Sequence, residues 1–471
     1  MIDARRVQRT FGDGFVAETV TDLQEAWMRH ADVILGDDHL VSAVYEALGT
    51  RHPQSRTRGR RGAPAEMVLR LLVLKHLRNW SYATVEREVR GNLVYRDFTR
   101  VGGGKVPDAK TMGRWGVAVG PGVIEDLHRR LIAIAQQQHV VEGRTLRVDT
   151  TVVETNIHYP TDSSLLGDGV RVLTRTMKKV TAIAGAVGAT LRDRSRSVRH
   201  RLWEIGRIAR SKGAQRQEKL TRAYQRLLAA TSRVVGQAKR FSREIGAGVK
   251  RSRDVRQQAA LEGWRQELDT FVPRVQQVLR QTRARILGGD THVEDKLLSV
   301  FEPSTEVIRK GKAGKPNEFG KMVKLQEAEH QIITEYVVYE KRPSDSDLLI
   351  PALGAHAQTF GQVPRLVAAD AAFYSGANEA SAHASGVTRV CIPNQATKSA
   401  ERKREQKTRW FKNGQKWRTG CEGRISVVKR RHGLNRSRYK GADGMKRWVG
   451  LGVIADTLIN ISRVLATRAD T

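Results

Sequence analysis

The sequence is poor in cysteine and lacks any long hydrophobic run. Its two cysteines, Cys391 and Cys421, do not form a CxxC pair, which excludes a disulfide framework and a cysteine-based zinc site. No stretch approaches about 18 uncharged apolar residues, so nothing is expected to span a membrane. The first residues, MIDARRVQRTFGDGF, lack the apolar core of a signal peptide. We therefore expect a soluble protein of a reducing, cytoplasmic compartment.

Acidic residues are also scarce relative to basic ones. The chain has 471 residues and carries 83 Lys and Arg against 49 Asp and Glu, a formal net charge of +34. A soluble chain with this excess repels itself unless it meets a polyanion, of which nucleic acid is the commonest. An RNA-packing protein and a protein that binds anionic membranes are the alternatives. The length predicts two or three domains.

Residues 1–63 are predicted to be an N-terminal segment that ends in a basic arm. The stretch RHPQSRTRGRRGAP, residues 51–64, is basic and is broken by proline and glycine, as loops are. The candidate DNA contacts in this arm are Arg60, Arg61 and position 57. Position 57 is a threonine, Thr57, and lies between two arginines.

Residues 64–140 are predicted to form a helical DNA-binding domain. Ser81 is placed to cap a helix whose Val85 and Val89 face inward, and Asp108 is placed to cap a later helix. Short helices, tight turns and basic faces are typical of a helix-turn-helix-like DNA module. A plain helical bundle with a solvated charged face is the alternative.

Residues 165–288 are predicted to form a basic helical insertion. Residues 171–290 hold 29 Lys and Arg against 9 Asp and Glu, and apolar residues recur there at helical spacing. Gly246 and Gly248 indicate a turn between two long helices. Such an arm suits a grip on the DNA backbone. A dimerising coiled coil with solvated charges is the alternative, and the two roles are compatible.

Residues 141–164 and 289–471 are predicted to form an α/β domain around a mixed sheet with an antiparallel and a parallel side. Strands are expected at 145–157, 297–303, 321–329, 330–343, 363–373 and 387–393, and a long amphipathic helix at 443–467. The strand at 363–373 is nearly all apolar, as in strands buried on both faces.

Two aspartates end apolar strands of this domain. Asp149 follows LRV and Asp370 follows PRLVAA, and adjacent strands would bring them together. Two carboxylates a few ångström apart need a cation between them, and Mg²⁺ binds through carboxylates, phosphate oxygens and water. Two such ions can clamp the attacking and leaving oxygens of a phosphodiester.

A third carboxylate is expected on a nearby helix, KWRTGCEGRISVVKRR. Arg418, Glu422 and Lys429 are four and seven residues apart and so share one helix face. Glu422 would reach the metal ions, whereas Arg418 and Lys429 would bind phosphates. Taken singly, each of these residues also has a purely structural explanation. Asp149 is typical of a turn, Asp370 is typical of a helix cap, and Arg418 with Glu422 is typical of a surface ion pair.

Other polar residues near these motifs are ranked lower or given supporting roles. The carboxylates Glu154 and Asp162 do not end the apolar run, and His158 and His432 suit exposed or phosphate-facing positions better than catalytic ones. Thr150, Thr151 and Asn156 supply small polar groups for hydrogen bonds to the metal ligands.

The order of the motifs VDTTVVETN, LVAADAAFYSGAN and WRTGCEGRISVVKRR resembles that of the DDE transposases of bacterial insertion sequences. One large branch of them carries Tyr, two residues, Arg, three residues, Glu, six residues and Lys on its Glu helix. Arg418, Glu422 and Lys429 match this spacing, but Gln415 stands at the tyrosine position. The stretch 64–116 resembles the N-terminal domain of such transposases.

This resemblance implies an RNase H-like fold in which Asp149, Asp370 and Glu422 hold two Mg²⁺ ions, with Mn²⁺ as a substitute. It implies a nucleoid-associated bacterial enzyme that binds terminal inverted repeats of double-stranded DNA, cleaves the element ends and joins the 3′-hydroxyls to target DNA. A homodimer or larger assembly on DNA is expected, with phosphate contacts from Arg418, Lys429, Arg430 and Arg431. A metal-dependent nuclease or resolvase on the same fold, and a non-catalytic domesticated DNA-binding protein, are the alternatives.

Overall fold

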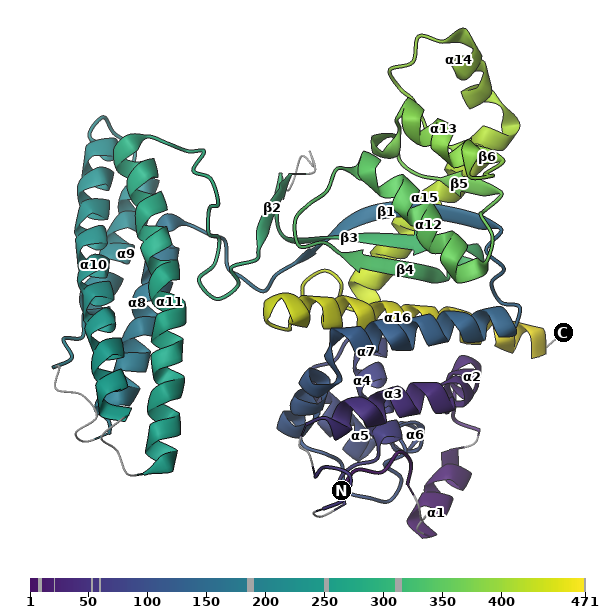
Figure 1. Cartoon of the computed structure of the whole chain (residues 1–471), viewed down its shortest axis with the longest axis horizontal. Helices are drawn as coiled ribbons and strands as arrows, with labels where there is room; N and C mark the ends of the chain where they lie inside the picture. Colours follow the sequence, from purple (N-terminus) through teal and green to yellow (C-terminus); the bar gives the residue numbers. More distant parts are fainter. Residues whose placement is uncertain are drawn as a thin grey trace. The chain divides into compact units, whose positions relative to one another are not determined.

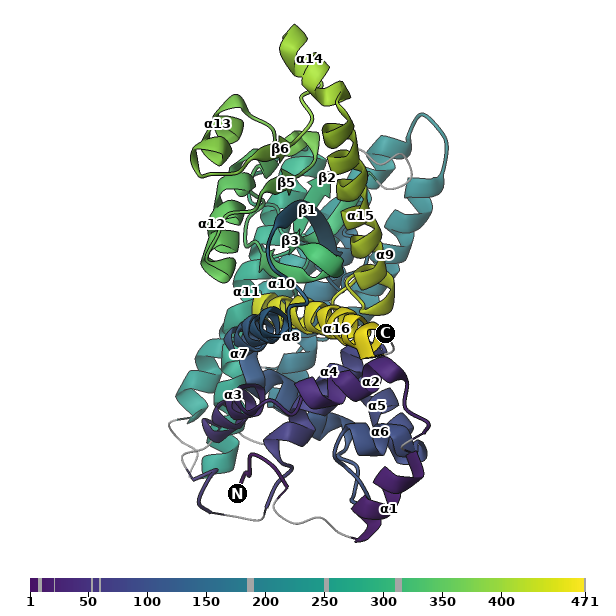
Figure 2. The same cartoon turned by 90° about the vertical axis from the view of Figure 1, so that its right-hand side faces the viewer.

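The computed structural model describes residues 1–6, 11–20, 22–51, 54–58, 61–183, 190–249, 254–309 and 316–469 (Figures 1 and 2). The chain divides into two compact units. Unit 1 comprises Met1–Asn156 and Val307–Thr471, and unit 2 comprises Ile157–Glu306. Unit 2 contains the predicted insertion, residues 165–288, but starts earlier and ends later. The finer predicted division, with boundaries at 63, 140 and 164, stays a prediction.

The N-terminal part of unit 1 is helical, as its apolar periodicity predicts. Its helices are α1 (Phe11–Val20), α2 (Ala26–Ile34), α3 (Asp38–Gly49), α4 (Ala65–Leu77), α5 (Tyr82–Gly91), α6 (Leu93–Phe98) and α7 (Ala109–Gln137). Both predicted caps are confirmed. The Ser81 side chain accepts a hydrogen bond from the Thr84 backbone N–H at 3.0 Å, and Asp108 accepts one from that of Thr111 at 2.9 Å. Val85 and Val89 are buried, also as predicted.

A mixed sheet forms the second part of unit 1, as predicted. Its strands are β1 (Thr145–Glu154), β2 (Glu306–Arg309), β3 (Asn317–Glu327), β4 (Ile333–Val338), β5 (Leu366–Ala368) and β6 (Arg389–Cys391). The order is β2-β3-β1-β5-β6, and β4 also pairs with β3. Pairing is antiparallel between β1 and β3 and between β3 and β4, and parallel from β1 through β5 to β6.

Helices cover both faces of this sheet. The remaining elements of unit 1 are η1 (Glu329–Gln331), η2 (Asp345–Leu348), α12 (Leu349–Phe360), η3 (Ala371–Phe373), α13 (Gly376–Ala384), α14 (Ala400–Lys407), α15 (Arg409–Arg431) and α16 (Gly441–Ala469). On β1, Leu146 and Val148 pack against Leu353 of α12, whereas Val153 packs with Val428 of α15. Figure 2 shows α12 and α15 on opposite sides of the sheet.

Helix α16 lies beneath the sheet, side by side with α7, and packs on α2 and α4 (Figure 1). By length and composition it is long and apolar enough to cross a membrane, but 72% of its apolar window is buried inside the protein. Its hydrophobic residues therefore have protein neighbours, as in the core helix of a globular protein.

The described residues of unit 2 form four helices, α8 (Asp162–Thr181), α9 (Ser195–Arg210), α10 (Arg216–Val249) and α11 (Val255–Gly288). They enclose a core of their own, which includes Leu173, Leu227, Phe241, Leu268 and Val275. The two long helices are present as predicted. The turn is not at Gly246 and Gly248, however, because α10 continues through both glycines to Val249.

The strand predicted at 297–303 is wrong. That segment has no strand, and the next one, β2, begins at Glu306. Leu297 and Val300 are apolar because they pack into the core of unit 2. The Gln281 side chain of α11 replaces a strand partner: its amide donates to the Leu297 carbonyl and its oxygen accepts from the Leu297 N–H, both at 3.0 Å.

A buried lysine joins the helical part of unit 1 to its C-terminal part. Lys75 of α4 is 2% exposed. Its Nζ lies 4.5 Å from the ring centre of Trp448, 4.9 Å from that of Tyr439 and 5.1 Å from that of Tyr82. Burial lowers the pKa of the Lys75 ammonium to about 7, and the positive charge of Arg438 adds to this effect. The three rings act in the opposite direction, because they attract a cation.

We predict that the folded protein becomes more stable between pH 7 and pH 9 because of Lys75. Above pH 7 the unfolded lysine, with a pKa near 10.4, still binds a proton that the folded one has lost, so stability rises with pH. The gain is about 2 kcal/mol over this interval. Urea unfolding at several pH values measures it, and Lys75→Met should lack it. Equal pH profiles for both proteins would mean that the aromatic rings keep Lys75 charged.

Candidate catalytic site

The prediction that Asp149 ends its strand is wrong, because β1 continues past it to Glu154, whereas Asp370 follows the last residue of β5 by two positions. In the β1/β5 ladder Thr145 pairs with Leu366 and Arg147 with Ala368, a constant offset of 221 residues. The same offset, continued two residues beyond the last pair, sets Asp149 opposite Asp370. The carboxyl ends of parallel strands in open α/β sheets are where ligands bind.

Asp149 points to the α15 side of the sheet. Successive side chains of a strand point to opposite faces of the sheet, so Asp149 points away from the α12 side, where Val148 packs. It shares its face with Arg147, which donates a hydrogen bond to α15. Its side chain is 16% exposed, and its Oδ2 lies 4.0 Å from Nη1 of Arg418. The backbone N–H of Thr150 donates to Asp149 Oδ1 at 2.7 Å, which helps to fix the carboxylate.

Asp370 is exposed and precedes the single turn η3. The Ala371 backbone N–H donates to its Oδ1 at 2.7 Å, so the capping role considered for this residue is present. A cap of this kind occupies one carboxylate oxygen and leaves the other accessible. Asn378 braces the following turn, because its amide donates to the carbonyls of Phe373 at 3.0 Å and Ser346 at 2.6 Å.

Arg418 connects Asp149 to Glu422. Its Nη2 donates to Glu422 Oε1 at 3.0 Å across one turn of α15, while its Nη1 faces Asp149. The arginine side chain is 13% exposed, whereas that of Glu422 is 57% exposed. The predicted ion pair therefore exists, but its arginine is largely covered by the sheet and also faces a second carboxylate, that of Asp149.

The structure does not gather the three predicted carboxylates into a ready metal cluster. Within the described ranges, no group of three or more His, Cys, Asp and Glu side chains lies close enough to hold a metal ion. The donor chemistry nevertheless fits a hard divalent cation, because all three candidates are carboxylates. The neighbouring thiol of Cys421 is a poor ligand, since burial raises its pKa well above the usual value.

Asp345 is a fourth carboxylate near Asp149. It lies in η2 and accepts a hydrogen bond at 3.0 Å from the hydroxyl of Thr150, the residue after Asp149. Sequence reasoning did not select Asp345 as a site residue. The polar run SDSD before an apolar helix was the available signal, but it is equally typical of a cap.

A buried ion pair holds α15 on β1, and sequence reasoning missed it. Arg147, two residues before Asp149, pairs with Glu327 of β3, and the two side chains are 5% and 1% exposed. Arg147 also donates to the Trp417 carbonyl of α15 and lies 4.9 Å from the centre of its ring. Burial raises the pKa of Glu327, and Arg147 opposes that rise. A charged residue inside the apolar run was the signal.

A second buried pair fixes the later part of α15. Arg424 donates to Asp456 of α16 at 2.8 Å, and burial raises the pKa of Asp456 to about 7. His432 lies 3.6 Å from the same carboxylate, is 1% exposed, and has a pKa lowered to about 4 by burial. This histidine is therefore a neutral core residue near pH 7 and is not exposed to DNA.

Gln415, at the position where the branch carries tyrosine, binds backbone. Its Nε2 donates to the Cys391 carbonyl at the end of β6 at 2.6 Å and lies 3.5 Å from the Ala369 carbonyl, next to Asp370. Gly414 beside it permits close packing, because a Cβ there would lie 2.5 Å from the Cys391 sulfur. This part of α15 is thus fitted to the strand ends.

The remaining predicted DNA contacts are solvent-facing where they are described. Lys429 is half-buried, and Arg430 and Arg431 are exposed at the end of α15. In the N-terminal arm, Thr57 and Arg61 are exposed, and Arg60 lies outside the described residues.

The lower-ranked residues have structural partners. Glu154 pairs with Arg436 at 2.9 Å, and the buried Asp162 pairs with Arg285 at 2.5 Å inside unit 2. His158 lies 3.5 Å from Asp168 in unit 2. Thr151 is buried, and Asn156 is exposed.

Two family models match parts of the chain. A transposase domain (DUF772) matches residues 26–116, which span α2 to the start of α7, and a transposase DDE domain matches residues 380–465, which include α15. Asp149 and Asp370 lie outside both matches. No curated protein and no solved structure matches the chain.

We predict that Arg147→Met destabilises the fold by about 3–5 kcal/mol, because it leaves Glu327 buried without its partner. Urea unfolding at pH 7 measures the loss. Arg147→Met combined with Glu327→Leu should recover most of the stability, since an apolar pair replaces the ionic one. The matched control is Arg436→Met, whose pair with Glu154 is partly exposed and should cost about 1 kcal/mol or less. A similar loss in the control would contradict the special role of Arg147.

Proposed function

We propose that this chain, two parts of which match transposase family models, is an insertion-sequence DDE transposase. It binds the terminal inverted repeats of its own element, cleaves the DNA at the element ends and joins the freed 3′-hydroxyls to target DNA. The observation that carries this proposal is the offset of 221 residues in the β1/β5 ladder, which, continued two residues past Arg147 and Ala368, sets Asp149 of β1 opposite Asp370. Helix α15, which carries Arg418 and Glu422, packs against the same two strands. We propose an RNase H-like sheet on the same basis.

Asp149, Asp370 and Glu422 are the proposed holders of two Mg²⁺ ions. Divalent ions bound by carboxylates polarise phosphoryl oxygens and make water or a hydroxyl a better nucleophile near neutral pH. Glu422 is 57% exposed, so its carboxylate can turn away from Arg418 without breaking the core. Asp149 is held more firmly, by the Thr150 N–H and by packing under α15. Asp345 is the alternative third carboxylate.

Arg418 and Lys429 are the proposed phosphate-binding groups. The Arg418 guanidinium already faces the Asp149 and Glu422 carboxylates at 4.0 and 3.0 Å. A scissile phosphate brought to this place offers the same planar pair of acceptor oxygens that a carboxylate does. Lys429, about three turns beyond Arg418 along α15, supplies a point charge for a neighbouring phosphate.

Both chemical steps are in-line displacements at phosphorus. In the first, a water oxygen bonds to phosphorus, the bond from phosphorus to the 3′-oxygen breaks, and a free 3′-hydroxyl remains. In the second, this hydroxyl loses its proton and attacks a target phosphate, whose own 3′-oxygen leaves. Two element ends require two such sites, so we propose a homodimer or larger assembly on DNA.

The N-terminal helices are proposed to recognise the terminal repeats. Helix α4 is buried along its whole length, so it cannot insert into a DNA groove. Helix α5 is suited to this contact, because its Arg87 and Arg90 side chains are 76% and 57% exposed. Basic residues of the arm that precedes α4 are proposed as further DNA contacts.

We predict that Asp149→Ala, Asp370→Ala and Glu422→Ala each abolish cleavage of end-containing DNA in Mg²⁺. Binding should change little, because affinity depends on lysine and arginine contacts to phosphate. Cleavage and joining products, mapped at nucleotide resolution with the element's own ends, are the measurement. Glu401→Ala, an exposed change on α14, is the matched control.

The same assay separates the alternatives. Cleavage without joining by the unaltered chain would indicate a nuclease, and binding without cleavage a non-catalytic DNA-binding protein. Normal cleavage by Glu422→Ala, combined with inactivity of Asp345→Ala, would move the third carboxylate to Asp345.

We predict that Arg418→Lys is strongly impaired in cleavage, because lysine cannot donate two parallel hydrogen bonds to one phosphate. Lys429→Ala should slow joining and weaken binding of pre-cut ends. Single-turnover rates and equilibrium binding of pre-cut duplexes distinguish the two effects. Rates equal to those of the unaltered protein for both variants would leave Arg418 and Glu422 as a structural ion pair.

A further inference from the structure

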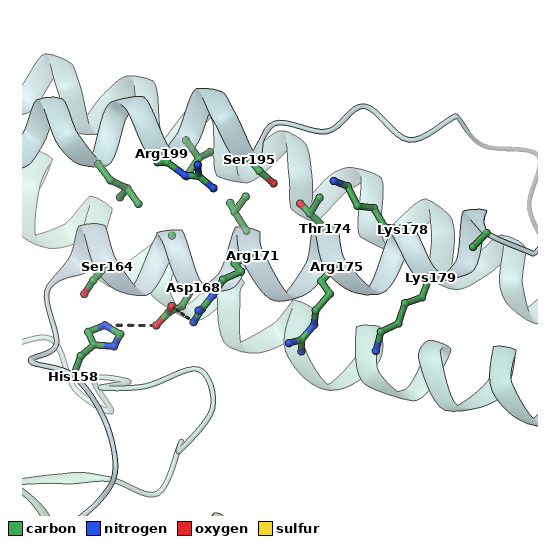
Figure 3. A pocket seen from close by; sticks show the side chains of 15 residues that line it. His158, Ser164, Asp168, Arg171, Thr174, Arg175, Lys178, Lys179, Ser195 and Arg199 are labelled. Atoms are coloured by element: carbon green, nitrogen blue, oxygen red, sulfur yellow. Dashed lines mark hydrogen bonds and ion pairs between the residues drawn. The ribbon is translucent and has the colours of Figure 1, made fainter.

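A basic groove runs between α8 and α9 of unit 2, and none of the residues that line it is assigned to catalysis. Its cavity has a volume of about 840 Å³. Figure 3 shows the cations along it, of which Arg171, Arg175, Lys178 and Lys179 come from α8 and Arg199 from α9. All five side chains are exposed.

The carboxylates in and around the groove do not neutralise all five cations. Arg171 pairs with Asp168 at 2.6 Å, Lys178 with Asp193 at 2.6 Å, and Arg175 weakly with Glu267 at 3.5 Å. Within the described part of the chain, Lys179 and Arg199 make no ion pair.

The charge is therefore distributed unevenly along α8. Asp168, which is engaged by Arg171 and by His158, marks one end of the groove. Lys179, near the other end of α8, makes no described ion pair. Arg199 of α9 lies nearer the Asp168 end of the groove (Figure 3) and adds a further cation there.

The floor of the groove is aliphatic, and the rim is cationic. Val170, Val198 and Leu202 line it, and their packing in the core of unit 2 holds α8 and α9 together. Among the described residues that line the groove there is no Phe, Tyr or Trp. A site for single-stranded nucleic acid or for a nucleotide would need such a ring to stack on a base. The lining fits an anionic backbone better than a base.

We propose that this groove binds the phosphate backbone of duplex DNA. Arg171 and Lys179 are eight residues apart, which is about 12 Å along the helix. A strand of B-DNA carries one phosphate per 3.4 Å of its axis, so about three to four phosphates can face this row. Because the contacts are to phosphate, binding is independent of base sequence. The inference rests on the proposed function, since it assigns the enzyme's DNA a second contact surface.

We predict that the triple variant Arg175→Gln, Lys179→Gln and Arg199→Gln binds duplex DNA more weakly and with a smaller salt dependence. Each lost phosphate contact flattens the slope of log K against log salt by about 0.9, so a change of about 2–3 is expected. Fluorescence anisotropy of the full chain on an end-containing duplex and on a scrambled duplex measures both quantities. The affinity should fall by the same factor on the two duplexes.

The matched control removes the same charge from another part of unit 2. Lys239, Arg240 and Arg243 are exposed on α10 and do not line the groove, and all three become Gln. The control should change the slope by less than about 1. Thermal unfolding followed by circular dichroism checks each fold. If the triple variant unfolds, Lys179→Gln with Arg199→Gln replaces it, because these two break no described ion pair.

An unchanged slope, or equal flattening in the groove variant and the control, would overturn the groove as a DNA site. A loss confined to the end-containing duplex would also overturn it, because phosphate contacts do not read sequence. Cleavage in Mg²⁺ is scored separately. A chain that never cleaves but shows the expected difference in slope would refute the proposed chemistry and leave the groove assignment standing.

Discussion

The buried ion pair between Arg147 and Glu327 is the constraint on which the candidate site depends. It joins the first strand to the third, and through the Trp417 carbonyl and ring it also fixes α15. Asp149 follows two residues later, so its direction is set by the same short stretch of β1. Arg424 and Asp456 form a second ion pair, which holds a later part of α15 in place. Buried pairs add little net stability, but breaking one is costly, so they act here mainly by fixing the position of the helix.

The sequence predicted where the strands lie better than it predicted which residues and elements they contact. Alternation and apolar runs located most strands, and the separation of 221 residues between Asp149 and Asp370 equals the offset of the β1/β5 ladder. Glu327, by contrast, lies 180 residues from Arg147, and no local pattern indicates that pairing. The error at 297–303 has the same origin. Its apolar residues looked like a strand, but their partners are helices of unit 2, which only tertiary packing decides.

At the site, sequence reasoning identified the residue types and missed the present arrangement. Spacing on one helix face correctly placed Arg418 beside Glu422. It could not reveal that the same guanidinium also faces Asp149, or that Asp345 approaches through Thr150. The Arg418 guanidinium lies between the two carboxylates, 4.0 Å from that of Asp149 and 3.0 Å from that of Glu422, and its positive charge offsets part of their mutual repulsion. Arg418 thus keeps the acidic side chains compatible with one another, and the same geometry suits it to receive a phosphate.

Lysines of similar appearance in the sequence have opposite roles in the fold. Lys75 lies in an apolar helix and is buried among three aromatic rings, where its charge is costly. Lys179 also lies in an amphipathic helix, but it is exposed at a groove whose carboxylates are engaged by other cations. A net charge of +34 therefore does not measure the charge available to DNA. What is available is the set of cations that folding leaves exposed and unpaired, and among the described residues Lys179 and Arg199 of the α8–α9 groove belong to that set.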